Sequence, residues 1–116
     1  MKAILTGAVL ALATATAEED YSSANVMLPY CKAYINETAQ ASPRAVGFCE
    51  GMIGTLAFMS GFLKNYPTLC IEFPAGVTFP QTVRVIVSYI EARPQRMHDP
   101  FLGLAIEALH DAWPCR

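Results

Sequence analysis

Charged residues are scarce in this 116-residue chain, where Lys, Arg, Asp and Glu together make up 16% of the sequence. The basic residues form no cluster beyond Arg93 and Arg96. Without Lys2, which lies in the N-terminal segment discussed below, seven basic residues face ten acidic ones, so the net charge is near −3. Nucleic acids and anionic membrane surfaces are therefore poor candidate partners.

Residue patterns that carry catalysis are also missing. The two histidines, His98 and His110, do not have the i, i+4 spacing that places two metal ligands on one helix face. No Ser lies in a nucleophile-elbow pattern, and a lone carboxylate such as Glu50 is usually solvated or hydrogen-bonded. Cysteines that form disulfides cannot act as thiolates. We expect no enzyme activity, no bound metal and no cofactor.

The N-terminal segment 1–17 is typical of a cleaved secretory signal peptide. It combines the basic Lys2, the apolar stretch Ala3–Ala13 and the small-residue motif Ala15-Thr16-Ala17. The apolar stretch is shorter than the roughly 20 residues that cross a bilayer. We expect cleavage after Ala17 and an exported single domain over residues 18–116.

Helix signals divide that domain into four predicted helices. The first begins at Ser23 or Asn25 and ends near Tyr34, with Pro29 in its first turn or at a kink. The second, from Ser42 to Asn65, begins with a capping Ser followed by Pro43. Its apolar stretch Ala45–Leu63 approaches membrane-spanning length, but the charge of Glu50 and the amphipathic neighbouring helices favour a soluble domain.

The other two helices have equally clear boundaries. Thr78 and Gln81 form a capping box for the third helix, which should end at Arg93 before Pro94. Asp99 is predicted to cap the fourth helix, with Pro100 in its first turn and Pro114 ending it. The predicted fold is therefore all-α, with two helical hairpins.

Four cysteines, Cys31, Cys49, Cys70 and Cys115, predict that disulfides tie these hairpins together. Cys49 lies roughly 24 Å from the end of its helix, farther than the about 17 Å that the chain returning to Cys70 can span. Antiparallel hairpins instead bring Cys31 to Cys49 and Cys70 to Cys115. Free or intermolecular thiols are the remaining alternative.

Glycines at positions 47, 51, 54 and 61 all lie inside the second predicted helix. Each costs the helix about 1 kcal/mol relative to alanine, so a packing reason is expected. One interpretation is a flat face for self-association. The simpler interpretation is close packing of neighbouring helices within the same chain.

Several motifs together resemble the Rap/Tai immunity family, whose members are periplasmic antidotes to type VI secretion amidases. The resemblance covers about residues 31–115. The motifs are Phe48-Cys49-Glu50-Gly51, Cys70, Pro74-x-Gly76-Val77-Thr78, Tyr89-Ile90-Glu91-x-x-Pro94 and Ala108-Leu109-x-x-Ala112-Trp113-Pro114-Cys115.

The resemblance implies a small helical homodimer in the periplasm that binds a peptidoglycan amidase and blocks its active-site groove. In such members the loop between the third and fourth helices enters the groove, which corresponds here to residues 93–100. Gln95, Arg96, Met97 and His98 are then the expected partner contacts, whereas an ordinary surface turn is the alternative. The family also includes chains without a known toxin partner.

Two other functions fit the same composition. A periplasmic acid-stress chaperone is also small, helical and disulfide-tied, and ten acidic residues would give it an acid response. A carrier of a small apolar ligand would need a cavity between the helices.

Overall fold

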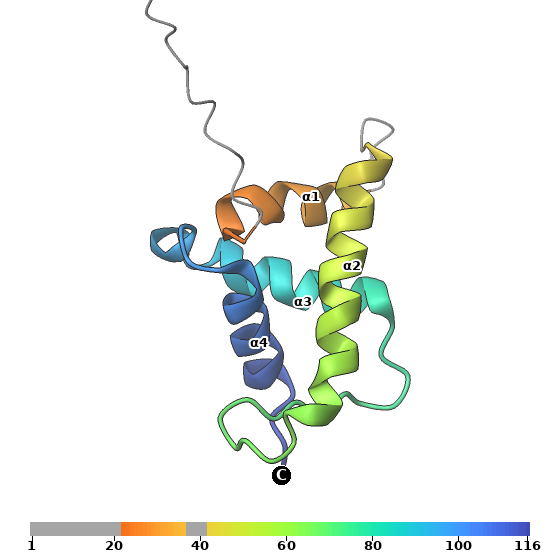
Figure 1. The fold of residues 1–116 in the computed structure, drawn as a ribbon, viewed down its shortest axis with the longest axis vertical. Coiled ribbons are helices and arrows are strands. Elements are labelled where there is room, and N and C mark those ends of the chain that lie inside the picture. The colour runs from red at the N-terminus through yellow and green to blue at the C-terminus, as the bar shows by residue number, and fades with distance from the viewer. Residues whose placement is uncertain (1–21, 37–41) are drawn as a thin grey trace, which may run out of the picture.

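The computed structural model describes residues 22–36 and 42–116, so the predicted signal peptide lies outside the described residues. The described chain forms four α-helices, α1 (Ala24–Asn36), α2 (Pro43–Met59), α3 (Phe79–Glu91) and α4 (Phe101–Ala112), and two short 3₁₀-helices, η1 (Ser60–Phe62) and η2 (Pro94–Arg96) (Figure 1). Strand pairing in these residues is limited to two isolated bridges. The predicted all-α class is confirmed.

The helices pack as the two predicted hairpins. α1 packs mainly against α2, and α3 packs mainly against α4. Contacts between α1 and α3 join the hairpins, and both of these helices lie across the direction of α2 and α4 (Figure 1).

One hydrophobic core lies where the four helices meet. Its largest fully buried side chains come from every helix and include Met27, Ile53, Ile86, Ile90, Phe101, Leu104 and Leu109. These residues follow helical spacing, so each helix turns one apolar stripe inward. Burial of a side chain of this size contributes about 1.5–3 kcal/mol, which makes this stripe packing the main stabilising term of the fold.

Two predicted helix starts are confirmed by their side-chain caps. The Ser42 hydroxyl accepts a hydrogen bond from the Ala45 N–H at 3.1 Å, and the Thr78 hydroxyl accepts one from the Gln81 N–H at 3.2 Å. The second helix is shorter than predicted, because its α-helical part ends at Met59 and tightens into η1. Pro29 lies inside α1 rather than in its first turn.

The prediction that Asp99 caps the fourth helix is wrong. Pro100 is the residue that precedes α4, and no side chain caps this end. The Asp99 carboxylate instead accepts a hydrogen bond from Arg96 Nε at 2.8 Å. A charge-assisted bond of this kind is stronger than a neutral one, so the nearby guanidinium takes the carboxylate away from the helix end.

Both predicted disulfides are present. Cys31 bonds to Cys49 with their Cα atoms 5.1 Å apart, and Cys70 bonds to Cys115 with a Cα separation of 5.6 Å. No cysteine in the described residues is free, so the alternative of free thiols is wrong. The first bridge is fully buried between α1 and α2, whereas the second ties the segment before α3 to the C-terminal segment after α4.

Candidate functional site

The loop between α3 and α4 carries all four predicted partner contacts. It contains η2 and lies at one edge of the molecule, beside the start of α1 (Figure 1). Gln95 and His98 are exposed, and 78% of the His98 side chain is accessible. Arg96 and Met97 are half-buried. The loop therefore offers two outward side chains and directs two others toward the rest of the chain.

Backbone hydrogen bonds attach this loop to the first turn of α1. The N–H of Asn25 donates to the Met97 carbonyl at 2.8 Å, and the N–H of Ala24 donates to the Asp99 carbonyl at 3.0 Å. The Ser23 hydroxyl donates to the same Met97 carbonyl at 3.3 Å. The first N–H groups of a helix have no partner within the helix. The loop carbonyls supply those partners, which fixes the loop and the start of α1 together.

Charged side chains form a second attachment on the other side of the loop. The Arg96 guanidinium donates to both carboxylate oxygens of Glu107 on α4, with Nη2 3.0 Å from Oε1. The Tyr89 hydroxyl on α3 donates to Glu107 Oε2 at 3.0 Å. The Arg93 guanidinium lies 3.5 Å from the centre of the Tyr89 ring. Glu107 therefore connects the loop with both helices that it joins.

The pKa values of these groups follow from the contacts. Hydrogen bonding to Arg96 lowers the pKa of Glu107 below its ordinary value, and the same bonds raise the pKa of Arg96. Burial, followed by the hydrogen bond to Glu107, raises the pKa of Tyr89. At neutral pH the carboxylate and the guanidinium are both charged and the phenol is protonated, which is the state that the geometry requires.

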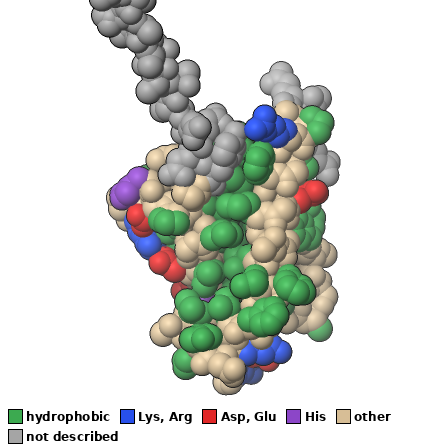
Figure 2. All heavy atoms as spheres, in the orientation of Figure 1, with side chains coloured by type: hydrophobic (Ala, Val, Ile, Leu, Met, Phe, Trp, Pro, Cys, Tyr) green, Lys and Arg blue, Asp and Glu red, His purple; other side chains and the backbone are tan. Residues whose placement is uncertain are grey.

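The resemblance pointed to the loop, but Glu107 was not among the expected site residues and Tyr89 was noted only as part of a family motif. Figure 2 shows a histidine beside acidic and basic side chains at the edge where this loop lies. The available signal was the opposite charge that follows Arg96 by eleven residues, in the second turn of the next helix. That signal is weak, because helix surfaces commonly carry charges of both signs.

The α2 helix carries a second unusual surface, which we call the α2 face. It contains residues three or four positions apart along α2 and η1, together with the adjacent exposed Met59, namely Gly47, Gly51, Gly54, Phe58, Met59, Gly61 and Phe62. A Cβ placed on any of these glycines meets no heavy atom within 4 Å. Within residues 22–36 and 42–116, no neighbouring helix therefore packs closely against these glycines, which contradicts the interpretation of close packing inside the same chain.

Aromatic side chains are concentrated at the end of the α2 face. Phe58 is 73% exposed and Phe62 is 64% exposed, and their ring centres lie 5.8 Å apart. Apolar side chains gather over this end of α2 in Figure 2. A groove of about 600 Å³ adjoins them, with Phe58, Lys64 and Phe73 in its lining. Contiguous exposed apolar surface on a small domain is a typical feature of protein interaction sites.

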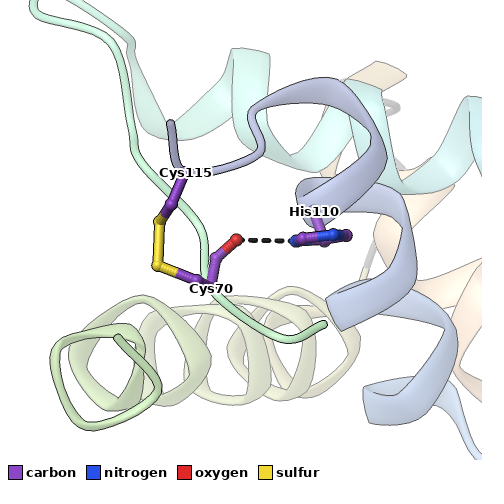
Figure 3. Close-up of a disulfide and its surroundings, with 3 residues drawn as sticks. All are labelled: Cys70, His110 and Cys115. Atoms are coloured by element: carbon purple, nitrogen blue, oxygen red, sulfur yellow. Dashed lines mark hydrogen bonds between the residues drawn. A yellow bond between two sulfur atoms is a disulfide. The ribbon is translucent and has the colours of Figure 1, made fainter. Parts of the chain in front are cut away.

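His110, for which the sequence suggested no role, holds the second disulfide in place. Its Nδ1 lies 2.7 Å from the Cys70 carbonyl oxygen (Figure 3). A carbonyl only accepts hydrogen bonds, so Nδ1 carries the proton and donates it. The contact ties α4 to the segment that bears the Cys70–Cys115 bridge.

The described residues contain no group of three His, Cys, Asp or Glu side chains placed to hold a metal ion. The stretch Pro43–Phe62, which comprises α2 and η1, is long and apolar enough to cross a membrane by length and composition. Core helices of soluble proteins meet the same criterion, and this helix is joined to α1 by a buried disulfide.

Comparison with known proteins gives one match. A family model described as Rap1a immunity proteins matches residues 22–115, which includes all four helices and both disulfides. Searches of curated proteins and of solved structures give no match.

Proposed function

This chain belongs to the Rap1a immunity protein family, and we propose that it protects its own cell by binding a peptidoglycan amidase delivered through type VI secretion. Binding would block the active-site groove of the amidase. The observation that carries the proposal is the family match over residues 22–115. An immunity protein acts by binding, which agrees with the attached, outward-facing loop and requires no catalytic group.

The proposed location is the periplasm, where an amidase would attack the cell wall. Two disulfides fit this oxidising compartment, since such bonds persist in the periplasm and are rare in the cytosol. The predicted signal peptide over residues 1–17 would direct the chain there.

The α3–α4 loop is the proposed element that enters the amidase groove. Gln95 and His98 face outward and offer hydrogen-bonding side chains. Arg96 and Met97 would contact the rim of the groove with the parts of their side chains that are not buried. Pro94 and Pro100 limit the conformations of the loop, which reduces the ordering cost of binding.

We test this proposal by mixing the mature domain with a candidate amidase and analysing the mixture by size-exclusion chromatography with mass detection. The first candidate is the product of the adjacent gene, if it is amidase-like, and we call this candidate the neighbouring-gene amidase. A complex of fixed ratio is the expected result. His98→Ala and Gln95→Ala should weaken it, while Gln81→Ala, on an exposed part of α3 away from the loop, should leave it intact. Separate elution of the wild-type domain would reject this amidase as partner and favour an orphan or chaperone role.

A homodimer formed through the α2 face is the second part of the proposal. The open glycines allow a second copy to approach the helix backbone closely, and Phe58 and Phe62 supply apolar contact area. The α2 face ends near the C-terminus and away from the α3–α4 loop (Figure 1). A dimer built on it would therefore leave the loop accessible to the amidase.

Mass-detected chromatography of the mature domain alone tests the dimer. The wild type should elute with the mass of two protomers, and the double substitution Phe58→Ser with Phe62→Ser should elute as one. Leu102→Ser is the matched control, because Leu102 is an exposed apolar residue on α4. A wild-type monomer at all concentrations would contradict the proposal.

A further inference from the structure

We infer that Glu107 is a positioning residue that holds the α3–α4 loop in its binding conformation before the partner arrives. The inference rests on the proposed function, in which this loop meets the partner. It assigns a role to a residue that is not itself expected to touch the amidase.

Glu107 is suited to this role because its carboxylate connects three elements. Both of its oxygens accept hydrogen bonds from the Arg96 guanidinium in the loop. The Tyr89 hydroxyl on α3 donates to the same carboxylate, and Glu107 itself belongs to α4. A bidentate contact fixes the direction of the guanidinium as well as its distance. The loop is thereby oriented relative to both helices that it joins.

The other attachments of the loop complete this arrangement. Asp99 accepts a hydrogen bond from Arg96 Nε, so the guanidinium is held from inside the loop as well as from α4. The Met97 and Asp99 carbonyls accept hydrogen bonds from the first turn of α1. The Met97 side chain packs against the hydrophobic core. The Gln95 and His98 side chains are exposed on this attached loop, as are Pro94 and Pro100.

The Arg96–Glu107 pair is partly exposed, with 37% and 42% of the two side chains accessible. Pairs this exposed contribute little to global stability. Such a pair can still hold a loop in one conformation, and a loop that is already ordered loses less conformational freedom on binding. Loss of Glu107 should therefore change the order of the loop and its affinity for the partner more than the stability of the fold.

The test compares Glu107→Gln with Glu91→Gln. The control removes the same charge and also breaks an ion pair, because Glu91 on α3 pairs with Lys32 at 3.2 Å with both side chains 46% exposed. Amide hydrogen exchange of residues 95–99 is measured in the free protein. We expect faster exchange in this segment for Glu107→Gln but not for Glu91→Gln. Exchange in the core of α3 should be unchanged in both variants.

Affinity for the neighbouring-gene amidase is the second readout. Glu107→Gln should raise the Kd roughly tenfold, while Glu91→Gln should not change it. The substitution His98→Ala should cost less affinity in the Glu107→Gln background than in the wild type. Two residues that act through one loop give such non-additive effects.

Unchanged loop exchange, or a Kd equal to that of the Glu91→Gln control, would overturn the inference. Strictly additive effects of Glu107→Gln and His98→Ala would also overturn it, because they indicate independent roles. If the wild type does not bind the amidase at all, the proposed function and the role of Glu107 in binding this amidase both fail. The exchange data then still decide whether Glu107 orders the loop, so the two failures are distinguishable.

Discussion

The ion pair between Glu107 and Arg96 should depend on pH, because the Glu107 carboxylate titrates in acid. Its folded-state pKa is lowered from the ordinary 4.5, mainly by hydrogen bonding to Arg96. A lowered pKa means that the contribution of this group to stability is fully present above pH 4.5 and is lost as the pH falls through the folded-state pKa. The loop should therefore keep its ion pair at neutral pH and lose it in acid.

We predict that the difference in free energy of unfolding between the wild type and Glu107→Gln shrinks as the pH falls below about 4.5, the ordinary value for this carboxyl. Urea denaturation of both proteins between pH 7 and pH 3 measures it. The comparison of the two proteins cancels the titration of the other carboxylates. A difference that stays constant over this range would show that Glu107 does not titrate with a lowered pKa.

The contacts of Asp99 and Glu107 with Arg96 were not predictable from the local sequence. Asp99 followed by Pro100 is a sound helix-start signal, yet the carboxylate bonds to Arg96 because that cation lies three positions earlier in the loop. The Arg96–Glu107 pair was not predictable in the same way. Its formation depends on the angle at which α4 leaves the loop, which the local sequence does not specify.

Within the helices, the glycines of α2 give a direct test of local packing. Gly47→Ala and Gly51→Ala should each stabilise the domain by up to about 1 kcal/mol, because alanine is a better helix former and its Cβ meets no neighbour. Urea denaturation measures this at a protein concentration low enough that self-association adds no stability.

Gly76→Ala is the control for this series. Gly76 has a φ of 84°, a backbone conformation that alanine adopts poorly, so this substitution should destabilise the domain. Loss of stability in Gly47→Ala or Gly51→Ala would mean that another part of the chain approaches the α2 face closely.

The helices themselves were largely predictable. Thr78 and Ser42 act as caps as expected, since a hydroxyl and the N–H three residues later make a local contact. The end of α2 was less predictable, because Gly61 and its neighbours tighten into a 3₁₀ turn without a strong stop signal. The open glycine face was ambiguous in the sequence, where a helix packed on both sides gives the same pattern.

The two disulfides act on the whole molecule. The Cys31–Cys49 bridge closes 18 residues and the Cys70–Cys115 bridge closes 45. Constraint of the unfolded chain grows with loop length, so replacing both cysteines of a pair by serine should cost about 3 kcal/mol for the first bridge and about 4 kcal/mol for the second. Urea denaturation of the two double variants measures these costs.

Burial of the first bridge acts against the expected order of these two stability losses. Cys31 and Cys49 are fully buried, so serine hydroxyls there need hydrogen-bond partners that the core does not supply. A smaller loss at Cys31 and Cys49 than at Cys70 and Cys115 would support the loop-length account. A larger loss would show that burial dominates over loop length.

The disulfide pairing was predictable because chain reach disfavours Cys49 with Cys70 and because helical hairpins bring Cys31 to Cys49 and Cys70 to Cys115. The binding partner of the protein is not encoded in such distances. The resemblance pointed to the loop at residues 93–100. The structure adds that hydrogen bonds attach this loop to the start of α1 and to α4. The identity of the amidase depends on the shape of another protein's groove.

The most direct test of the account is a titration of amidase activity. Peptidoglycan cleavage by the neighbouring-gene amidase is measured while the mature, disulfide-bonded domain is added in increasing amounts. We predict that cleavage falls to zero at one protomer per amidase and that the His98→Ala domain requires an excess. Full cleavage in the presence of a large excess of wild-type domain would contradict the claim that this chain neutralises that enzyme.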